Sequence, residues 1–130
     1  MKGIYCLLIK VKTTTTIKIG VLGNIPFDKG IYCYVGSAQK SIENRVSRHK
    51  SNGKKIRWHI DYFLDNENVS ITDVYYKEVG REEECSLARY LTKTELPINS
   101  FGCSDCKCKA HLFRLQSVAD FGKLGLTKLN

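Results

Sequence analysis

Residues 30–38 read GIYCYVGSA, and the part from Ile31 to Val35 is apolar and aromatic throughout. An uninterrupted run of this kind predicts a central, buried strand. Residues 36–38, which begin with a glycine, are expected to end this strand. Ser41 can then serve as the N-cap of a helix that runs to about His49. The other predicted elements extend outward from this strand and helix.

The rest of the chain supplies further strands and helices. Predicted strands cover residues 3–12, 17–22, 69–79 and 111–115, and predicted helices cover residues 58–64 and 82–94. Threonines 13–16 extend a strand or a hairpin tip, because Thr is β-branched. Residues 23–26 carry turn chemistry, and the last helix has a stripe of Cys85, Ala88 and Leu91. With a short C-terminal helical turn, this mixture predicts an α+β fold with a small, largely antiparallel sheet flanked by helices.

Length and composition limit the class of protein. The 130 residues are typical of one domain, so we expect a single domain over residues 1–130 with a Cys/His-rich C-terminal extension at about 101–130. A hydrophobic content of 42% excludes a mostly disordered chain. No apolar run approaches the roughly 18 residues of a membrane span, and the short run that ends before Lys10 reads better as a strand than as a signal peptide. We therefore expect a cytoplasmic protein with no membrane partner.

The chain is basic, with 21 Lys and Arg against 13 Asp and Glu and a formal net charge of +8. The cations concentrate between residues 39 and 58, whereas acids gather at 61–73 and 82–84. Clustered cations favour a polyanion, but charge alone does not separate nucleic acid from a membrane surface, an acidic protein or a solvated basic face. The residues expected to contact nucleic acid are Gly36, Ser37, Lys40, Arg48, Lys50, Lys54, Lys55, Arg57 and His59.

Side chains near the central strand could form a reactive pocket. Tyr34 precedes Gly36, and a glycine lets a backbone or a phosphate approach closely. Arg45 and His49 are four residues apart and share a helix face. A guanidinium binds phosphate oxygens bidentately, and an imidazole transfers protons near neutral pH. Alternatively, Tyr34 is a core aromatic and the two helix residues are solvated, while His59 makes a capping or core hydrogen bond.

These residues match a known pattern. Gly3-Ile4-Tyr5, Tyr34-Val35-Gly36, Arg45 on the following helix and an acid on a downstream helix resemble the GIY-YIG nuclease superfamily over roughly the first ninety residues. The stretches 30–38, 48–49, 58–62, 84–85 and 101–113 resemble one functionally uncharacterised prokaryotic subgroup of that superfamily, over nearly the whole chain. Gly30-Ile31-Tyr32 also spells the first motif, but it lies too close to Tyr34 to be its partner on another strand.

The resemblance implies a metal-dependent phosphodiesterase. Tyr5 and Tyr34 match the two motif tyrosines, which in the family lie side by side on adjacent strands and help to orient or deprotonate the attacking water. Arg45 matches the arginine that stabilises phosphate charge, and His49 lies where relatives carry a tyrosine or histidine. Glu84 best matches the acid that holds a divalent cation, usually Mg²⁺; Glu83 is the alternative, because three acids follow one another.

The leading hypothesis is therefore a Mg²⁺-dependent endonuclease that hydrolyses DNA phosphodiester bonds, at structured or damaged sites. A non-catalytic DNA- or RNA-binding module on the same fold is the second hypothesis, since residue 37 is Ser where excision-repair relatives carry a lysine. A metal-stabilised interaction domain, with its charge serving only solubility, is the third.

The C-terminal part also contains a group of metal-ligating residue types: Cys103, Cys106, Cys108 and His111. Thiolates and an imidazole suit Zn²⁺ in a tetrahedral site, so we predict structural zinc at these four residues. A disulfide such as Cys103–Cys106, or free thiols, are the alternatives. Cys85 could reach the cluster from its helix. Cys6 and Cys33 lie within strands and are expected to be buried as small hydrophobes.

Overall fold

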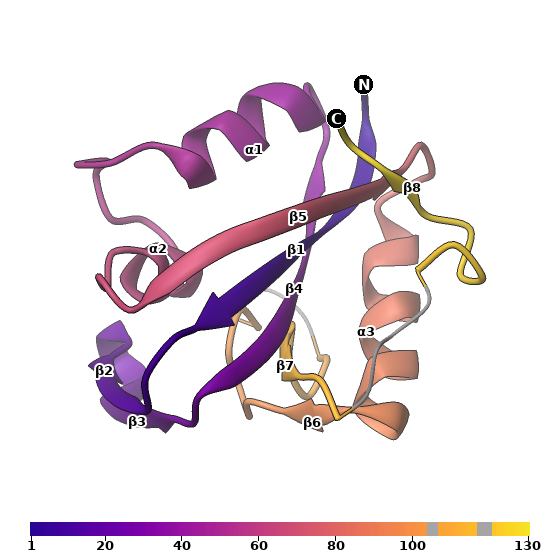
Figure 1. Ribbon diagram of the computed structural model, residues 1–130. Coiled ribbons are helices and arrows are strands. Elements are labelled where there is room, and N and C mark those ends of the chain that lie inside the picture. The colour runs from indigo at the N-terminus through magenta and orange to yellow at the C-terminus, as the bar shows by residue number, and fades with distance from the viewer. Residues whose placement is uncertain (104–106, 117–120) are drawn as a thin grey trace.

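Figure 1 shows the computed structural model of the chain, which describes residues 1–103, 107–116 and 121–130. Its main sheet consists of β1 (Gly3–Val11), β4 (Gly30–Ala38), β5 (Val69–Lys77), β6 (Leu96–Pro97), β7 (Leu112–Arg114) and β8 (Thr127–Lys128). Its helices are α1 (Ile42–Lys50), α2 (His59–Leu64) and α3 (Glu82–Thr94). The predicted α+β fold with an antiparallel sheet is confirmed. No helix in the described ranges has both the length and the apolarity to cross a membrane.

The strands of the main sheet follow the order β6-β7-β4-β1-β5-β8, and each strand is antiparallel to its neighbours. The predicted central position of β4 is confirmed, because β4 lies between β7 and β1. The strand was predicted over residues 31–35, with residues 36–38 ending it, but β4 is longer and includes residues 36–38. These residues pair with the first residues of β1, ending at Gly3↔Ala38, so the ladder continues past the glycine.

Successive residues of β1 pack into two apolar clusters on opposite faces of the sheet. Tyr5 and Leu7 belong to the cluster under α1 and α2, whereas Cys6 belongs to the cluster under α3 together with Cys33. Side chains of a strand alternate between faces, so a strand that is covered on both faces is apolar without interruption. Figure 1 shows α3 on one side of these strands and α1 and α2 on the other. The two cysteines are buried, as predicted.

The hairpin after β1 differs from the prediction. The second strand, β2 (Thr15–Lys18), is shorter than expected and is followed by a 3₁₀ helix, η1 (Gly20–Leu22). Residues 23–26, predicted as a turn, instead lie mostly in β3 (Asn24–Phe27), which pairs with β2. The chain reverses at Gly20 and Gly23, whose φ angles are 49° and 76°. Glycine adopts positive φ readily, so these two residues, and not the proline, make the turn.

The C-terminal segment is part of the main sheet. β7, predicted over residues 111–115, pairs with β4. Hydrogen bonds from Leu124 N to Phe121 O and from Gly125 N to Gly122 O form the turn expected near the C-terminus. The short strand β8 then pairs with β5, which the sequence did not predict. The segment after α3 therefore supplies the strands at both edges of the main sheet, β6 and β8.

Candidate active site

An open cleft of about 1350 Å³ lies beside the last residues of β4. β7 and His111 cover β4 as far as Val35, whose N–H donates to His111 O. Beyond that residue, no described strand pairs with the outer edge of β4. Side chains from several elements meet around this open edge. Four of the five residues expected to be catalytic line the cleft: Tyr5, Tyr34, Arg45 and Glu84.

The ring of Tyr5 lies across the backbone of Gly36, its partner in the β1–β4 ladder. A Cβ atom at residue 36 would lie 2.6 Å from Tyr5 Oη. That separation is shorter than non-bonded atoms allow, so glycine leaves the space that the phenol occupies. Tyr34 pairs with Leu7, two residues along the ladder, and its side chain therefore projects from the same face as Tyr5. The register of these two strands brings the two tyrosines together.

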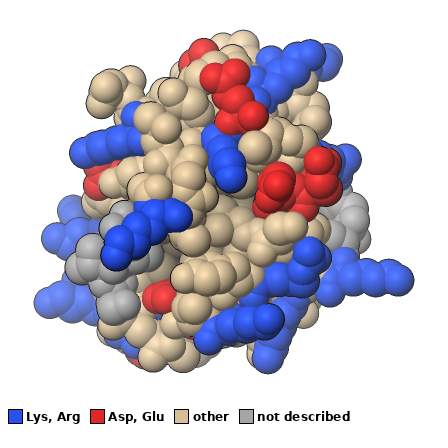
Figure 2. Space-filling view, turned by 90° about the vertical axis from the view of Figure 1, so that its right-hand side faces the viewer, with Lys and Arg blue, Asp and Glu red and all other residues tan. Residues whose placement is uncertain are grey.

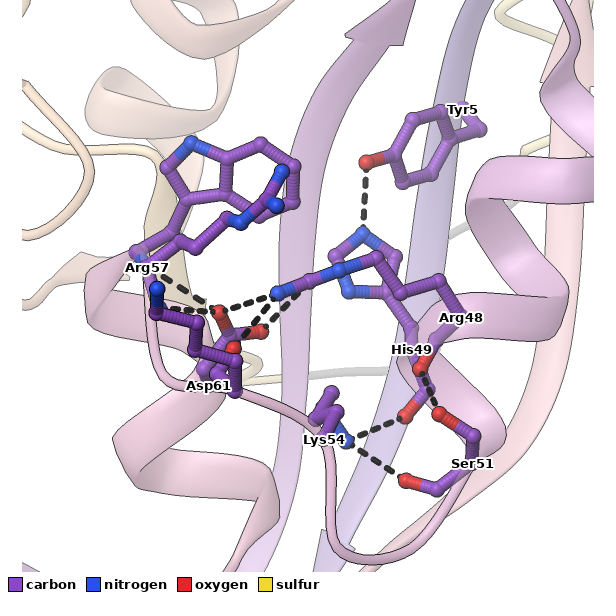
Figure 3. A network of polar contacts seen from close by, with 9 residues as sticks. Tyr5, Arg48, His49, Ser51, Lys54, Arg57 and Asp61 are labelled. Carbon is purple, nitrogen blue, oxygen red and sulfur yellow. Dashed lines mark hydrogen bonds and ion pairs between the residues drawn. The ribbon is translucent and has the colours of Figure 1, made fainter.

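His49, the fifth predicted residue, lies behind Tyr5. Its Nε2 is 2.7 Å from Tyr5 Oη (Figure 3), and the two side chains are 2% and 1% exposed. Burial lowers the pKa of His49 to about 4, so its ring is neutral at pH 7. Burial also raises the pKa of Tyr5, an effect that Arg45 opposes. Burial raises the pKa of Tyr34 as well, so both tyrosines are uncharged at neutral pH.

Arg45 extends from α1 toward Tyr5. Ser41 caps this helix as predicted, since its Oγ accepts a hydrogen bond from Asn44 N at 3.1 Å. Arg45 Nη1 donates to Ser37 O at 3.1 Å, and the guanidinium carbon lies 4.7 Å from the centroid of the Trp58 ring. Contacts of this kind restrict a long cationic side chain to few rotamers. Arg45 therefore presents a positioned positive charge inside the cleft.

Arg48 and Asp61 form a brace in the cleft wall, which the sequence did not predict. Two Arg48 nitrogens each donate to one Asp61 oxygen at 3.0 Å, and Asp61 also accepts from the N–H groups of Arg57 and Trp58 (Figure 3). Burial raises the pKa of Asp61, but these hydrogen bonds hold it below its ordinary value. The bidentate pair ties α1 to the start of α2. Arg48 thus has a structural partner within the chain, whether or not it also contacts a ligand.

The residues predicted to contact nucleic acid separate into two groups. Those in the described lining of the cleft are Gly36, Ser37, Lys40, Arg48, Arg57 and His59. Lys50, Lys54 and Lys55 lie outside that lining, and Lys54 Nζ instead donates to His49 O and Ser51 O (Figure 3). His59 Nδ1 accepts a hydrogen bond from Gly102 N at 2.9 Å. An internal hydrogen bond of this kind was the alternative to a contact between His59 and nucleic acid.

Charge is not uniform over the surface of the molecule. Figure 2 shows the face that carries α3, with many Lys and Arg side chains along its lower part and most of its visible acids in the upper half. The cleft lining itself combines several cations with two acids, Glu82 and Glu84. Arg81 and Trp58 also line it, and the sequence analysis predicted neither as a site residue. An anion entering the cleft therefore meets both cations and carboxylates.

Glu84 lies in the first turn of α3, where the helix dipole favours acids. Its side chain is 19% exposed, and its Oε2 lies 3.3 Å from His111 Nδ1. The charge of Glu84 raises the pKa of both Tyr5 and Tyr34, which shows that it lies within electrostatic reach of the phenols. Glu83, the alternative ligand, is outside the described lining of the cleft.

Thiols and an imidazole meet where α3 contacts the C-terminal segment. Cys85 Sγ, Cys108 Sγ and a ring nitrogen of His111 all lie within 4.8 Å of one another. The predicted set thus contributes Cys108 and His111, and Cys85 joins them from α3. Cys103 is outside this group, and Cys106 lies outside the described residues. No disulfide joins two of the cysteines that the structure describes.

Comparison with known proteins adds one match. Residues 4–127 match the family described as Domain of unknown function DUF123. No curated protein and no solved structure matches the chain.

Proposed function

The chain belongs to this family of unknown function, and we propose that it is a metal-dependent endonuclease of the GIY-YIG type that hydrolyses DNA phosphodiester bonds. One observation carries the proposal: two phenols, a guanidinium and a carboxylate line a single cleft, from Tyr5, Tyr34, Arg45 and Glu84. Phosphodiester hydrolysis needs a group that orients and deprotonates water, a cation for the phosphate oxygens and a ligand for a divalent metal. These four side chains can supply all three.

The hydrogen bond between His49 and Tyr5 supports a role for Tyr5 in handling the attacking water. Within the described part of the chain, the buried Nδ1 of His49 has no hydrogen-bond partner. A buried N–H without a partner is rarer than an acceptor without one, so we assign the proton of the neutral ring to Nε2. Nε2–H then donates to Tyr5 Oη. The phenol keeps its own proton and a lone pair for a water molecule in the cleft.

In this mechanism Tyr5 acts from its phenolate form: the phenol O–H proton leaves to solvent in the cleft, and Oη then accepts one proton from the water that attacks phosphorus. Burial raises the pKa of Tyr5 and so disfavours the phenolate, which therefore needs nearby positive charge. Arg45 lowers the pKa of Tyr5, and the His49 N–H stabilises the phenolate oxygen. Tyr34, on the same face, lies beside Tyr5 and restricts where the water can lie.

Arg45 is proposed to bind the phosphate. Its hydrogen bond to Ser37 O anchors one nitrogen, and the face of Trp58 restricts the guanidinium plane. A guanidinium held in advance stabilises the negative charge that develops on the phosphoryl oxygens, and it does so without reorganisation during the reaction.

Glu84 fits a ligand for Mg²⁺. In phosphate-processing sites Mg²⁺ commonly binds through one or two carboxylates and fills its other positions with water and phosphate oxygens. Glu84 supplies one carboxylate in the cleft, and the contact between its Oε2 and His111 Nδ1 restrains that carboxylate. When bound, the metal would polarise the phosphoryl group and stabilise the leaving oxygen.

Cleavage assays with matched variants test this proposal. Wild type, Glu84→Ala, Arg45→Ala and Glu83→Ala are incubated with supercoiled plasmid and with branched DNA, each with and without Mg²⁺. We expect Mg²⁺-dependent cleavage by wild type and by the control Glu83→Ala, and a loss of at least about a hundredfold in the other two. Equal cleavage by all four proteins would point to a contaminating nuclease or to a different site, and would refute this assignment.

Trp58 supports a second candidate function, a non-catalytic DNA- or RNA-binding module. Its ring is 36% exposed and lies beside the guanidinium groups of Arg45 and Arg48. An exposed aromatic ring next to cations can stack on a base while the cations contact phosphates. This candidate predicts binding that weakens steeply with salt and no cleavage of any DNA or RNA substrate. A fluorescence titration at two salt concentrations, run beside the cleavage assay, distinguishes the two candidates.

A further inference from the structure

We propose that Cys85, Cys108 and His111 bind Zn²⁺, and that the ion joins α3 to the C-terminal segment. Cys108 and His111 are close in sequence. Cys85 lies in α3, which β6 and the following loop separate from them along the chain. The site is distinct from the proposed Mg²⁺ ligand Glu84, and zinc binding does not depend on nuclease activity.

The three ligand atoms are slightly farther apart than in a zinc site, and a small movement of the side chains would bring them to zinc-binding distances. The two Sγ atoms and the imidazole nitrogen lie within 4.8 Å of one another. A tetrahedral Zn²⁺ with ordinary Zn–S and Zn–N bonds separates its ligand atoms by about 3.3–3.8 Å. Contraction of the group by about 1 Å, which side-chain rotation can supply, gives that geometry. Three protein ligands leave the fourth position for a water molecule or a further ligand.

The surroundings of His111 favour one tautomer. Its Nδ1 lies 3.3 Å from Val35 O and 3.3 Å from Glu84 Oε2, and both of these atoms accept hydrogen bonds. The Nδ1 atom therefore carries the proton, and Nε2 carries the lone pair that a metal requires. Metal-binding histidines commonly donate their second ring N–H to a backbone carbonyl or a carboxylate in this way. The ring is also nearly fully buried, which limits its rotation.

The chemistry of the group selects zinc over the hard cations. Two thiolates and an imidazole are soft or borderline ligands, and the group contains no carboxylate oxygen. A second, smaller cavity of about 430 Å³ also reaches both thiols. Its other lining residues include the cations Arg89, Lys93, Lys107 and Lys109. These positive side chains offset the negative charge that two zinc-bound thiolates bring to the site.

Zinc binding at this point would affect the proposed catalytic site through one residue. His111 Nδ1 lies 3.3 Å from Glu84 Oε2, and the tautomer assigned above leaves Nε2 for the zinc ion. A metal on Nε2 would keep the Nδ1–H directed at the carboxylate and would restrict the orientation of Glu84. This consequence, unlike zinc binding itself, rests on the proposed nuclease function.

Metal analysis of the full chain tests the zinc site in the absence of nucleic acid and Mg²⁺. The reduced protein is loaded with Zn²⁺, passed through a desalting column and analysed by elemental mass spectrometry. We expect about one equivalent of zinc in wild type and less than about a fifth in Cys85→Ala and His111→Ala. Cys33→Ala is the matched control, because it removes a thiol from the same side of the sheet outside the ligand group, and it should retain about one equivalent.

A second measurement on wild type alone covers the case in which a variant fails to fold. Co²⁺ in place of Zn²⁺ should give the intense visible bands of a tetrahedral ion and a thiolate-to-cobalt charge-transfer band. Zinc below about a tenth of an equivalent in wild type, full zinc in Cys85→Ala, or a Cys85–Cys108 disulfide in the metal-loaded protein would each overturn the proposal. Because this readout needs no DNA, a failed zinc site and a failed nuclease assignment give different results.

Discussion

The two faces of β1 and β4 differ in chemistry. On the face under α1 and α2, Tyr5 is hydrogen-bonded to His49, and the buried Asp61 accepts a hydrogen bond from each of two Arg48 nitrogens. On the face under α3, the same two strands bury apolar side chains and thiols, among them Cys6 and Cys33. Buried polar groups are tolerated when hydrogen bonds satisfy them. Each face of the sheet therefore packs an apolar cluster, and the face under α1 and α2 also holds this hydrogen-bonded polar network.

The largest effect that we expect comes from breaking the polar brace. Asp61→Ala leaves the Arg48 guanidinium and two backbone N–H groups without their acceptor, so unfolding free energy should fall by about 3–5 kcal/mol. Chemical denaturation measures this change. The control is Asp73→Ala, whose ion pair with Lys128 is exposed and should contribute little. Similar losses of unfolding free energy in both variants would show that the Arg48–Asp61 pair contributes no more to stability than an exposed ion pair.

Two substitutions on β4, Gly36→Ala and Cys33→Ala, compare how the two faces of the sheet affect DNA cleavage. The added methyl group would lie 2.6 Å from Tyr5 Oη, so the ring must move, and under the proposed function DNA cleavage should fall about a hundredfold. Cys33→Ala changes the opposite face of β4 and should leave cleavage per folded molecule unchanged. Cleavage rates, measured at a temperature where both variants are folded, provide the comparison. Unchanged cleavage in Gly36→Ala would contradict the role given to the position of Tyr5.

The pH dependence of stability should report the burial of His49. Its pKa is about 4 in the folded protein and near 6.5 in the unfolded chain, so the unfolded state binds more protons between these values. The stabilisation is fully present above pH 6.5 and is lost as the pH falls toward 4. Between pH 7 and pH 5 the loss should be about 2 kcal/mol.

His49→Gln isolates this contribution, because glutamine does not titrate. Unfolding free energies of wild type and variant, each measured at pH 7 and pH 5, give the difference that belongs to His49. Equal pH dependence in the two proteins would mean that His49 is not buried in its neutral form.

Short sequence patterns predicted those helices and strands that depend mainly on residues close together in the sequence. The central β4 strand, the Ser41 cap of α1 and the span of α3 were all expected, because each follows from the properties of neighbouring residues. The turn predicted over residues 23–26 failed because β3 forms only by pairing with β2. The short strand β8 was missed for the same reason, since it exists through its ladder with β5.

The same division applies to the candidate site. The order of Tyr5, Tyr34, Arg45 and Glu84 along the chain is a property of the amino-acid sequence, as are their side-chain chemistries and the positive charge around them. Folding alone decided that Asp61 engages Arg48 and that Cys85 lies beside His111. Contacts of that kind join residues far apart in sequence. Their distances depend on strand register, helix packing and the open edge of β4, which no short stretch of sequence encodes.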